Sequence, residues 1–135
     1  IGFQSSFRIG GGITEQFSLF YISNVSWVKN VSEVLVNPGV GGLAGQYYFK
    51  PNSPSAYVIG GGGLAAYTRY DAGVNSEYSH SGLGYFVGAG YEIQKHLSIE
   101  ASINNSGKLL NTQMPMEVVG IKSSAIALTL NYTFY

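Results

Sequence analysis

The side chains best suited to chemistry in this chain are its two histidines. His80 lies between Ser79 and Ser81, which resembles a nucleophile beside its general base. Adjacent side chains of a strand point to opposite faces, however, so neither serine is well placed against this histidine. His96 has no second metal ligand near it in sequence, and the chain has no cysteine. We therefore expect no catalytic residues, no metal site and no cofactor.

Two glycine runs, 10–12 and 60–63, have the composition of phosphate-binding loops. Such a loop needs a strand before the glycines and a helix after them, so that the helix N-terminus faces the anion. No helical pattern follows either run. We interpret the glycines instead as relief of crowding in a strongly curved sheet.

Arg8 and Glu100 are charged residues on strand faces that are otherwise small and polar. A buried charge is costly unless it is paired or hydrogen-bonded. We therefore expect the two to lie in an internal, structural network, with a gate or proton path as the alternative. Four amides on the same faces would extend this network: Gln4, Gln46, Asn104 and Asn131.

Strands must position these residues, because apolar and polar side chains alternate through most of the chain. Alternation is sharpest at the end, where Ile126, Leu128, Leu130, Tyr132 and Phe134 share one face. Seven strands are predicted, at about 2–13, 17–28, 39–50, 56–70, 82–93, 97–104 and 123–135. Short turns at 14–16, 51–55 and 94–96 alternate with connections at 29–38, 71–81 and 105–122. Periodicity does not settle which way the side chains of the fourth strand face.

The alternation also assigns the faces of the other strands. The outward set is predicted to be Leu83, Tyr85, Val87, Leu97, Ile99, Leu128 and Leu130. The inward set is predicted to be Arg8, Glu92, Glu100, Ser102 and Thr129. Aromatic residues cluster towards strand ends, as in the girdles at a membrane–water interface. These aromatics are Tyr47, Phe49, Tyr57, Tyr85, Tyr91, Tyr132 and Phe134.

Composition supports a chain in contact with lipid. The 135 residues correspond to one domain, and only 10% of them are charged, against about 25% in soluble domains. Seven basic and seven acidic residues cancel, so nothing points to nucleic acid. No apolar run approaches the roughly 20 residues of a spanning helix, so a membrane would be crossed by strands.

The stretch from Leu128 to Phe134 resembles the closing strand of outer-membrane-protein-A-like barrels. The strand pattern of nearly the whole chain is similar to that family from its second strand onward. The resemblance implies an all-β, antiparallel, up-and-down transmembrane β-barrel, eight-stranded when complete, in the outer membrane of a Gram-negative bacterium. Residues 1–135 would then be a single barrel domain whose first strand lies upstream of Ile1, or is supplied by another chain or segment. Tyr135 departs from the pattern, since it is out of phase with the lipid-facing residues.

The same resemblance implies a non-enzymatic role in envelope integrity or surface interaction. The partners would be outer-membrane lipids, lipopolysaccharide and the barrel-assembly machinery, which reads the C-terminal strand. A narrow, porin-like pore for small solutes is one alternative. A lipid-modifying enzyme is another, but Asn104 stands where the His-x-Ser motif of lipid A deacylases has its histidine. A soluble ligand-binding barrel would instead turn its apolar faces inward.

Overall fold

A computed structural model describes residues 2–29, 35–70, 77–107, 110–111 and 124–132. Over these residues the fold is all-β, as predicted, and no helix is long and apolar enough to cross a membrane. The strands are β1 (Gly2–Gly12), β2 (Phe17–Lys29), β3 (Leu35–Tyr48), β4 (Ser55–Tyr70), β5 (Glu77–Gln94), β6 (Leu97–Ser106), β7 (Leu110–Asn111) and β8 (Ser124–Tyr132).

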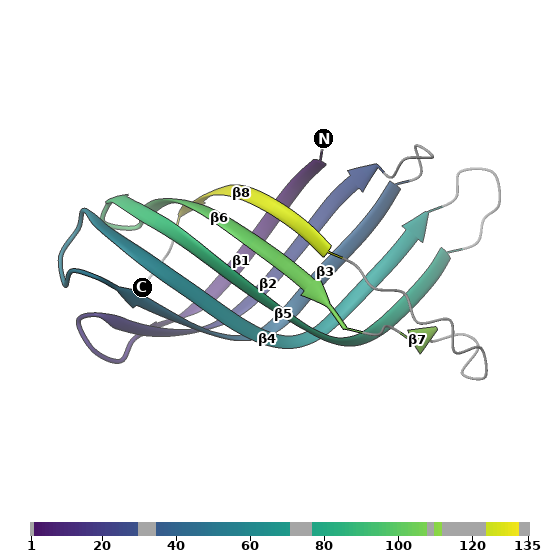
Figure 1. Cartoon of the computed structure of the whole chain (residues 1–135), viewed down its shortest axis with the longest axis horizontal. Helices are drawn as coiled ribbons and strands as arrows, with labels where there is room; N and C mark the ends of the chain where they lie inside the picture. The colour runs from purple at the N-terminus through teal and green to yellow at the C-terminus, as the bar shows by residue number, and fades with distance from the viewer. Residues whose placement is uncertain (1, 30–34, 71–76, 108–109, 112–123, 133–135) are drawn as a thin grey trace.

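The strands form one sheet in which chain neighbours pair antiparallel, in the order β1-β2-β3-β4-β5-β6-β8. The two-residue β7 pairs with β5 beside this path. The sheet curls into a trough, and the turns that join β1 to β2, β3 to β4 and β5 to β6 gather at one end (Figure 1, left). No pairing joins β1 to β8 in the described part of the chain. The fold is therefore an up-and-down half-barrel, consistent with an incomplete β-barrel.

Three strands extend into segments predicted to be connections. β3 begins at Leu35 rather than at 39, β5 begins at Glu77 rather than at 82, and β6 ends at Ser106 rather than at 104. The predicted connection at 105–122 also contains the short strand β7. The prediction of connections is therefore wrong for residues 35–38 and 77–81. Both segments form backbone pairs with β4, although one contains a proline and the other is polar. Even Pro38 pairs with Tyr67, and β4 offers partners to the whole of β3. Residues 30–34 and 71–76 lie outside the described part of the chain.

The predicted faces of the strands are confirmed. Leu83, Leu128 and Leu130 are more than two-thirds exposed on the convex face, at 73%, 78% and 71%. Glu100 and Ser102 are buried on the concave face. The remaining members of each set follow the same alternation, with Tyr85, Val87 and Ile99 exposed, Leu97 intermediate, and Glu92 and Thr129 buried. In β4, whose facing the sequence left open, the odd-numbered positions such as Ile59 point inward.

The inside of the sheet is only half polar. Strands β2 to β5 bury an apolar cluster against one another, whereas β1, β6 and β8 present mostly polar or small residues. The buried hydrophobic residues are Phe20, Ile22, Val36, Val40, Ala44, Tyr57, Ile59, Ala65 and Phe86. This cluster packs half of the interior, while the other half must be held by polar contacts.

Inward-facing glycines allow the close approach of β3 and β4. Gly42 and Gly63 are register partners, and a Cβ on Gly63 would lie 2.6 Å from the Cα of Gly42. Both glycine runs lie inside strands, and no helix follows them in the described residues. The interpretation of these glycines as relief of crowding is supported, because a side chain at Gly63 would force the two backbones apart.

Candidate functional site

The centre of the polar half is an ion pair between β1 and β6. Arg8 Nη2 lies 2.7 Å from Glu100 Oε1, and the two side chains are only 6% and 1% exposed. The two residues are 92 positions apart in sequence, but each occupies an inward position of its strand. The contact between Arg8 and Glu100 that we expected from their inward positions is present. A charge-assisted bond at this depth is stronger than one in water, since little solvent screens it.

Tyr57 brings β4 into the same contact. Its hydroxyl lies 3.0 Å from Glu100 Oε2 and 3.1 Å from Ser98 Oγ. The prediction that Tyr57 belongs to an interfacial girdle is wrong, because its side chain is buried on the concave face. Glu100 therefore has a partner on each carboxylate oxygen, and the cluster of Arg8, Glu100, Tyr57 and Ser98 ties β1, β4 and β6 together.

Gly90, on β5, makes room for the Tyr57 ring. A Cβ at Gly90 would lie 2.5 Å from the Tyr57 hydroxyl oxygen and 2.8 Å from the carbonyl oxygen of Ile99. We expect Gly90→Ala to push Tyr57 away from Glu100 and to lower the free energy of unfolding by about 1–3 kcal/mol. Denaturant unfolding followed by tyrosine fluorescence measures this loss.

Gly11→Ala is the matched control, because nothing lies within 4 Å of a Cβ at Gly11. Its free energy of unfolding should stay within about 0.5 kcal/mol of the wild type. Equal effects of the two alanines would contradict a specific role for Gly90.

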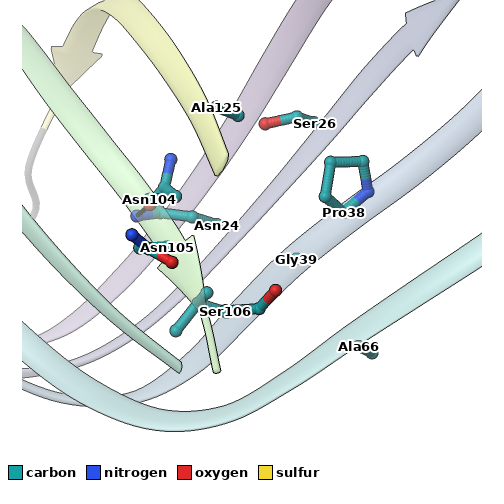
Figure 2. A pocket seen from close by; sticks show the side chains of 10 residues that line it. Asn24, Ser26, Pro38, Gly39, Ala66, Asn104, Asn105, Ser106 and Ala125 are labelled. Atoms are coloured by element: carbon teal, nitrogen blue, oxygen red, sulfur yellow. Dashed lines mark hydrogen bonds between the residues drawn. The ribbon is translucent and has the colours of Figure 1, made fainter. Parts of the chain in front are cut away.

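A second layer of the network consists of amides and lies towards the end opposite the tight turns. Gln4 Oε1 accepts hydrogen bonds from Ser26 Oγ at 3.1 Å and from Asn104 Nδ2 at 3.2 Å. Asn24 Nδ2 donates to Asn104 Oδ1 at 3.4 Å. Figure 2 shows Asn24 and Asn104 close together beside a small cavity of about 10 Å³, room for about one water molecule. This layer joins β1, β2 and β6.

The other two predicted amides have different surroundings. Asn131 Nδ2 donates to Thr129 Oγ1 at 3.3 Å, and that hydroxyl donates to the carbonyl oxygen of Glu100 at 3.4 Å, so Asn131 extends the network as expected. Gln46 is buried on β3. Among the described residues, no hydrogen bond joins the Gln46 side chain to the network, because Gln46 faces inward on the apolar side.

A third polar layer lies at the end with the tight turns, and the sequence did not single it out. Glu92 is buried and accepts a hydrogen bond from Ser53 Oγ, while Ser55 Oγ accepts one from the Lys50 amide at 3.0 Å. These residues line a cavity of about 540 Å³. The alternation of β5 predicted that Glu92 faces inward. It could not predict the partner of Glu92, because Ser53 lies in the turn at 49–54 and alternation says nothing about the conformation of a turn.

The histidines lie apart from this network. His80 is buried on the concave face against the ring of Tyr67, with centroids 6.4 Å apart, whereas Ser81 is exposed on the convex face. The two side chains lie on opposite faces of the sheet, as expected for adjacent residues of a strand, so Ser81 is separated from His80. The ring of His96, in the turn after β5, lies beside the ring of Tyr132, with the two ring centroids 6.2 Å apart. The described residues contain no group of three or more His, Cys, Asp or Glu side chains suited to a metal ion.

The other described residues of the predicted aromatic girdle lie on the convex face. Tyr47 and Phe49 stack edge to face with ring centroids 5.9 Å apart, and the exposed set is Tyr47, Phe49, Tyr85, Tyr91 and Tyr132. Phe134 lies outside the described residues. Compared with known protein families, with curated proteins and with solved structures, the chain gives no match in any of the three.

Proposed function

We propose that this protein is an integral outer-membrane β-barrel protein with a structural or surface-interaction role, without enzymatic activity. The observation that carries the proposal is the convex face, where large apolar side chains are exposed along the strands while Arg8, Glu92 and Glu100 point inside. Such a surface would be a severe aggregation liability in water. It is the surface that lipid stabilises.

Spacing along β5 supports the same proposal. Tyr85 and Tyr91 are both exposed, with only Val87 and Ala89 exposed between them. The outward apolar residues continue from Leu83 to Ile93, about 33 Å of strand. At the tilt of about 35–45° found in outer-membrane barrels this length covers about 25 Å along the membrane normal, the height of their apolar band. Tyr91, Tyr47 and Tyr132 belong to the end with the tight turns, which would be the periplasmic end in this proposal.

The interior favours a structural role over a pore. Glu100 is held on both oxygens, and the apolar cluster around Ile22 and Phe86 fills the other half. An eight-stranded interior is just wide enough to be filled by its own side chains. In a closed barrel, side chains arranged in this way would leave no continuous path for ions, so the connections between strands and the outer surface would carry the protein's interactions.

Lipid accessibility tests the proposal. The chain has no cysteine, so a single cysteine can be introduced and spin-labelled at Leu130, on the convex face, or at its neighbour Thr129, on the concave face. In protein folded into phosphatidylcholine vesicles, the label at Leu130 should be accessible to dissolved oxygen and shielded from a water-soluble nickel chelate. The label at Thr129 should be shielded from lipid. A Leu130 label open to the nickel chelate would overturn the membrane assignment.

A further inference from the structure

The cavity beside Glu92 lies at the end of the sheet where the tight turns gather (Figure 1, left). Its volume of about 540 Å³ is within the range of small-molecule sites, about 300–1,000 Å³. Residues of all three tight turns line it, together with inward residues of the adjoining strands. Tyr48 lines the cavity and packs against Tyr57, with ring centroids 5.4 Å apart. The cavity therefore borders the cluster around Glu100 without including it.

Hydrogen bonds hold the turns that form the walls of this cavity. The Tyr48 amide donates to the Gln16 carbonyl oxygen at 2.8 Å, and Gln16 Nε2 donates to the Tyr48 carbonyl oxygen at 3.3 Å, so the first turn is fixed to the end of β3. In the next turn, the Lys50 amide donates to Ser55 Oγ at 3.0 Å. A site that is formed before its ligand arrives needs little ordering when it binds.

The cavity contains charges of both signs that do not pair with each other. Glu92 is only 5% exposed; its Oε1 accepts a hydrogen bond from Ser53, and in the described part of the chain no partner reaches its Oε2. Lys50 and Lys95 line the same cavity and are exposed, and among the described residues neither ammonium group forms an ion pair. A buried carboxylate is costly without a cationic partner. Glu92 is therefore an anionic anchor that lacks its cation.

We infer that this cavity binds a small zwitterion of dipeptide size. The ammonium group of the ligand binds Glu92, and its carboxylate binds Lys50 and Lys95. The two lysines that line the cavity balance its two carboxylates, Glu15 and Glu92, so a ligand with both charges complements it better than an ion of one sign. An extended dipeptide separates its charges by up to about 7 Å, which suits groups that do not contact each other. This inference rests on the cavity and not on the proposed membrane location.

Other occupants suit the cavity less well. A divalent cation prefers several carboxylate ligands, and the described residues contain no group of three or more acidic, histidine or cysteine side chains. An inorganic anion would meet the carboxylates of Glu15 and Glu92. An apolar ligand would leave Glu92 and both lysines without partners.

Binding of L-alanyl-L-alanine to the whole chain, folded in a non-ionic detergent, tests the inference. Saturation-transfer NMR detects the methyl groups of this dipeptide when it is bound. We expect a Kd on the order of 1 mM for a ligand of this size. N-acetyl-dialanine lacks the ammonium group and dialanine amide lacks the carboxylate. Each should bind at least about tenfold more weakly, because each loses hydrogen bonds to a charged group.

Variants locate the binding site. Glu92→Gln keeps an acceptor for the Ser53 hydroxyl but removes the charge, so it should weaken dialanine binding about tenfold and leave the acetylated peptide unaffected. Replacing Lys50 and Lys95 together by glutamine should have a similar effect. The matched control replaces both by arginine, which keeps the charges and should preserve binding. If Glu92→Gln fails to fold, the three ligands compared on the wild type still decide.

Three results would contradict the inference. Equal binding of dialanine and its acetylated form to the wild type would mean that Glu92 does not select a cation. No saturable transfer to dialanine well above millimolar concentration would mean that the cavity holds only water. Unchanged binding in a folded Glu92→Gln variant would place the peptide elsewhere on the molecule. None of these results bears on the membrane location, which the label at Leu130 tests separately.

Discussion

Replacing Glu100 with alanine should lower the free energy of unfolding by about 3–5 kcal/mol. Arg8 would keep its charge in a site where its side chain is only 6% exposed, and Tyr57 would lose an acceptor. The Arg8→Ala/Glu100→Ala double variant should lose less, because it leaves no buried charge unpaired. Denaturant titrations of the two variants and the wild type, in the same lipid or detergent, measure the difference.

Two controls separate the ion pair from the general cost of mutation. Glu15→Ala removes an exposed carboxylate in a turn and should change stability by less than about 0.5 kcal/mol. Glu100→Gln retains an acceptor for the Tyr57 hydroxyl but removes the charge, so it should fall between wild type and Glu100→Ala. Single-variant losses that simply add in the double variant would mean that solvent already screens the two charges.

The same network should prevent ion flow. The buried Arg8–Glu100 pair is neutral and the interior beside it is packed, so the intact protein should give no steady current in planar lipid bilayers. Steady conductance together with additive variants would indicate a solvated lumen. A pore for small solutes would then replace the structural role as the leading proposal.

Alternation alone was sufficient to predict the facing of most strands and the pair at the centre of the site. Period two places every second residue on one face, so Arg8 and Glu100 could be assigned to the interior without knowledge of their partners. Their contact followed because a buried charge needs an opposite one. The same reasoning holds for Gln4 and Asn104, whose amides meet across the interior.

The sequence did not predict the apolar half of the interior or the place of Tyr57. The four glycines at 60–63 carry no side chain, so they interrupt the alternation that would have assigned Tyr57 to the concave face. Ile22 and Phe86 point to the concave face, although the other inward residues of their strands are mostly small or polar. Both belong to the buried apolar cluster that strands β2 to β5 form across the curled sheet. Such packing depends on which strands lie opposite, and a linear pattern does not contain that information.

Leu128→Arg should destabilise the membrane-embedded protein by about 2–4 kcal/mol. Leu128 is the central residue of β8 and is 78% exposed on the convex face, which the proposed location turns towards the acyl chains. An arginine near the bilayer midplane carries a penalty of this size, and the penalty falls to about 0–1 kcal/mol at the interface. Ser124→Arg, at the first residue of β8, is therefore the matched control and should be nearly neutral. Reversible unfolding from phosphatidylcholine vesicles measures both variants. If Leu128→Arg folds into vesicles with wild-type stability, the convex face does not meet lipid, and the membrane proposal fails while the fold stands.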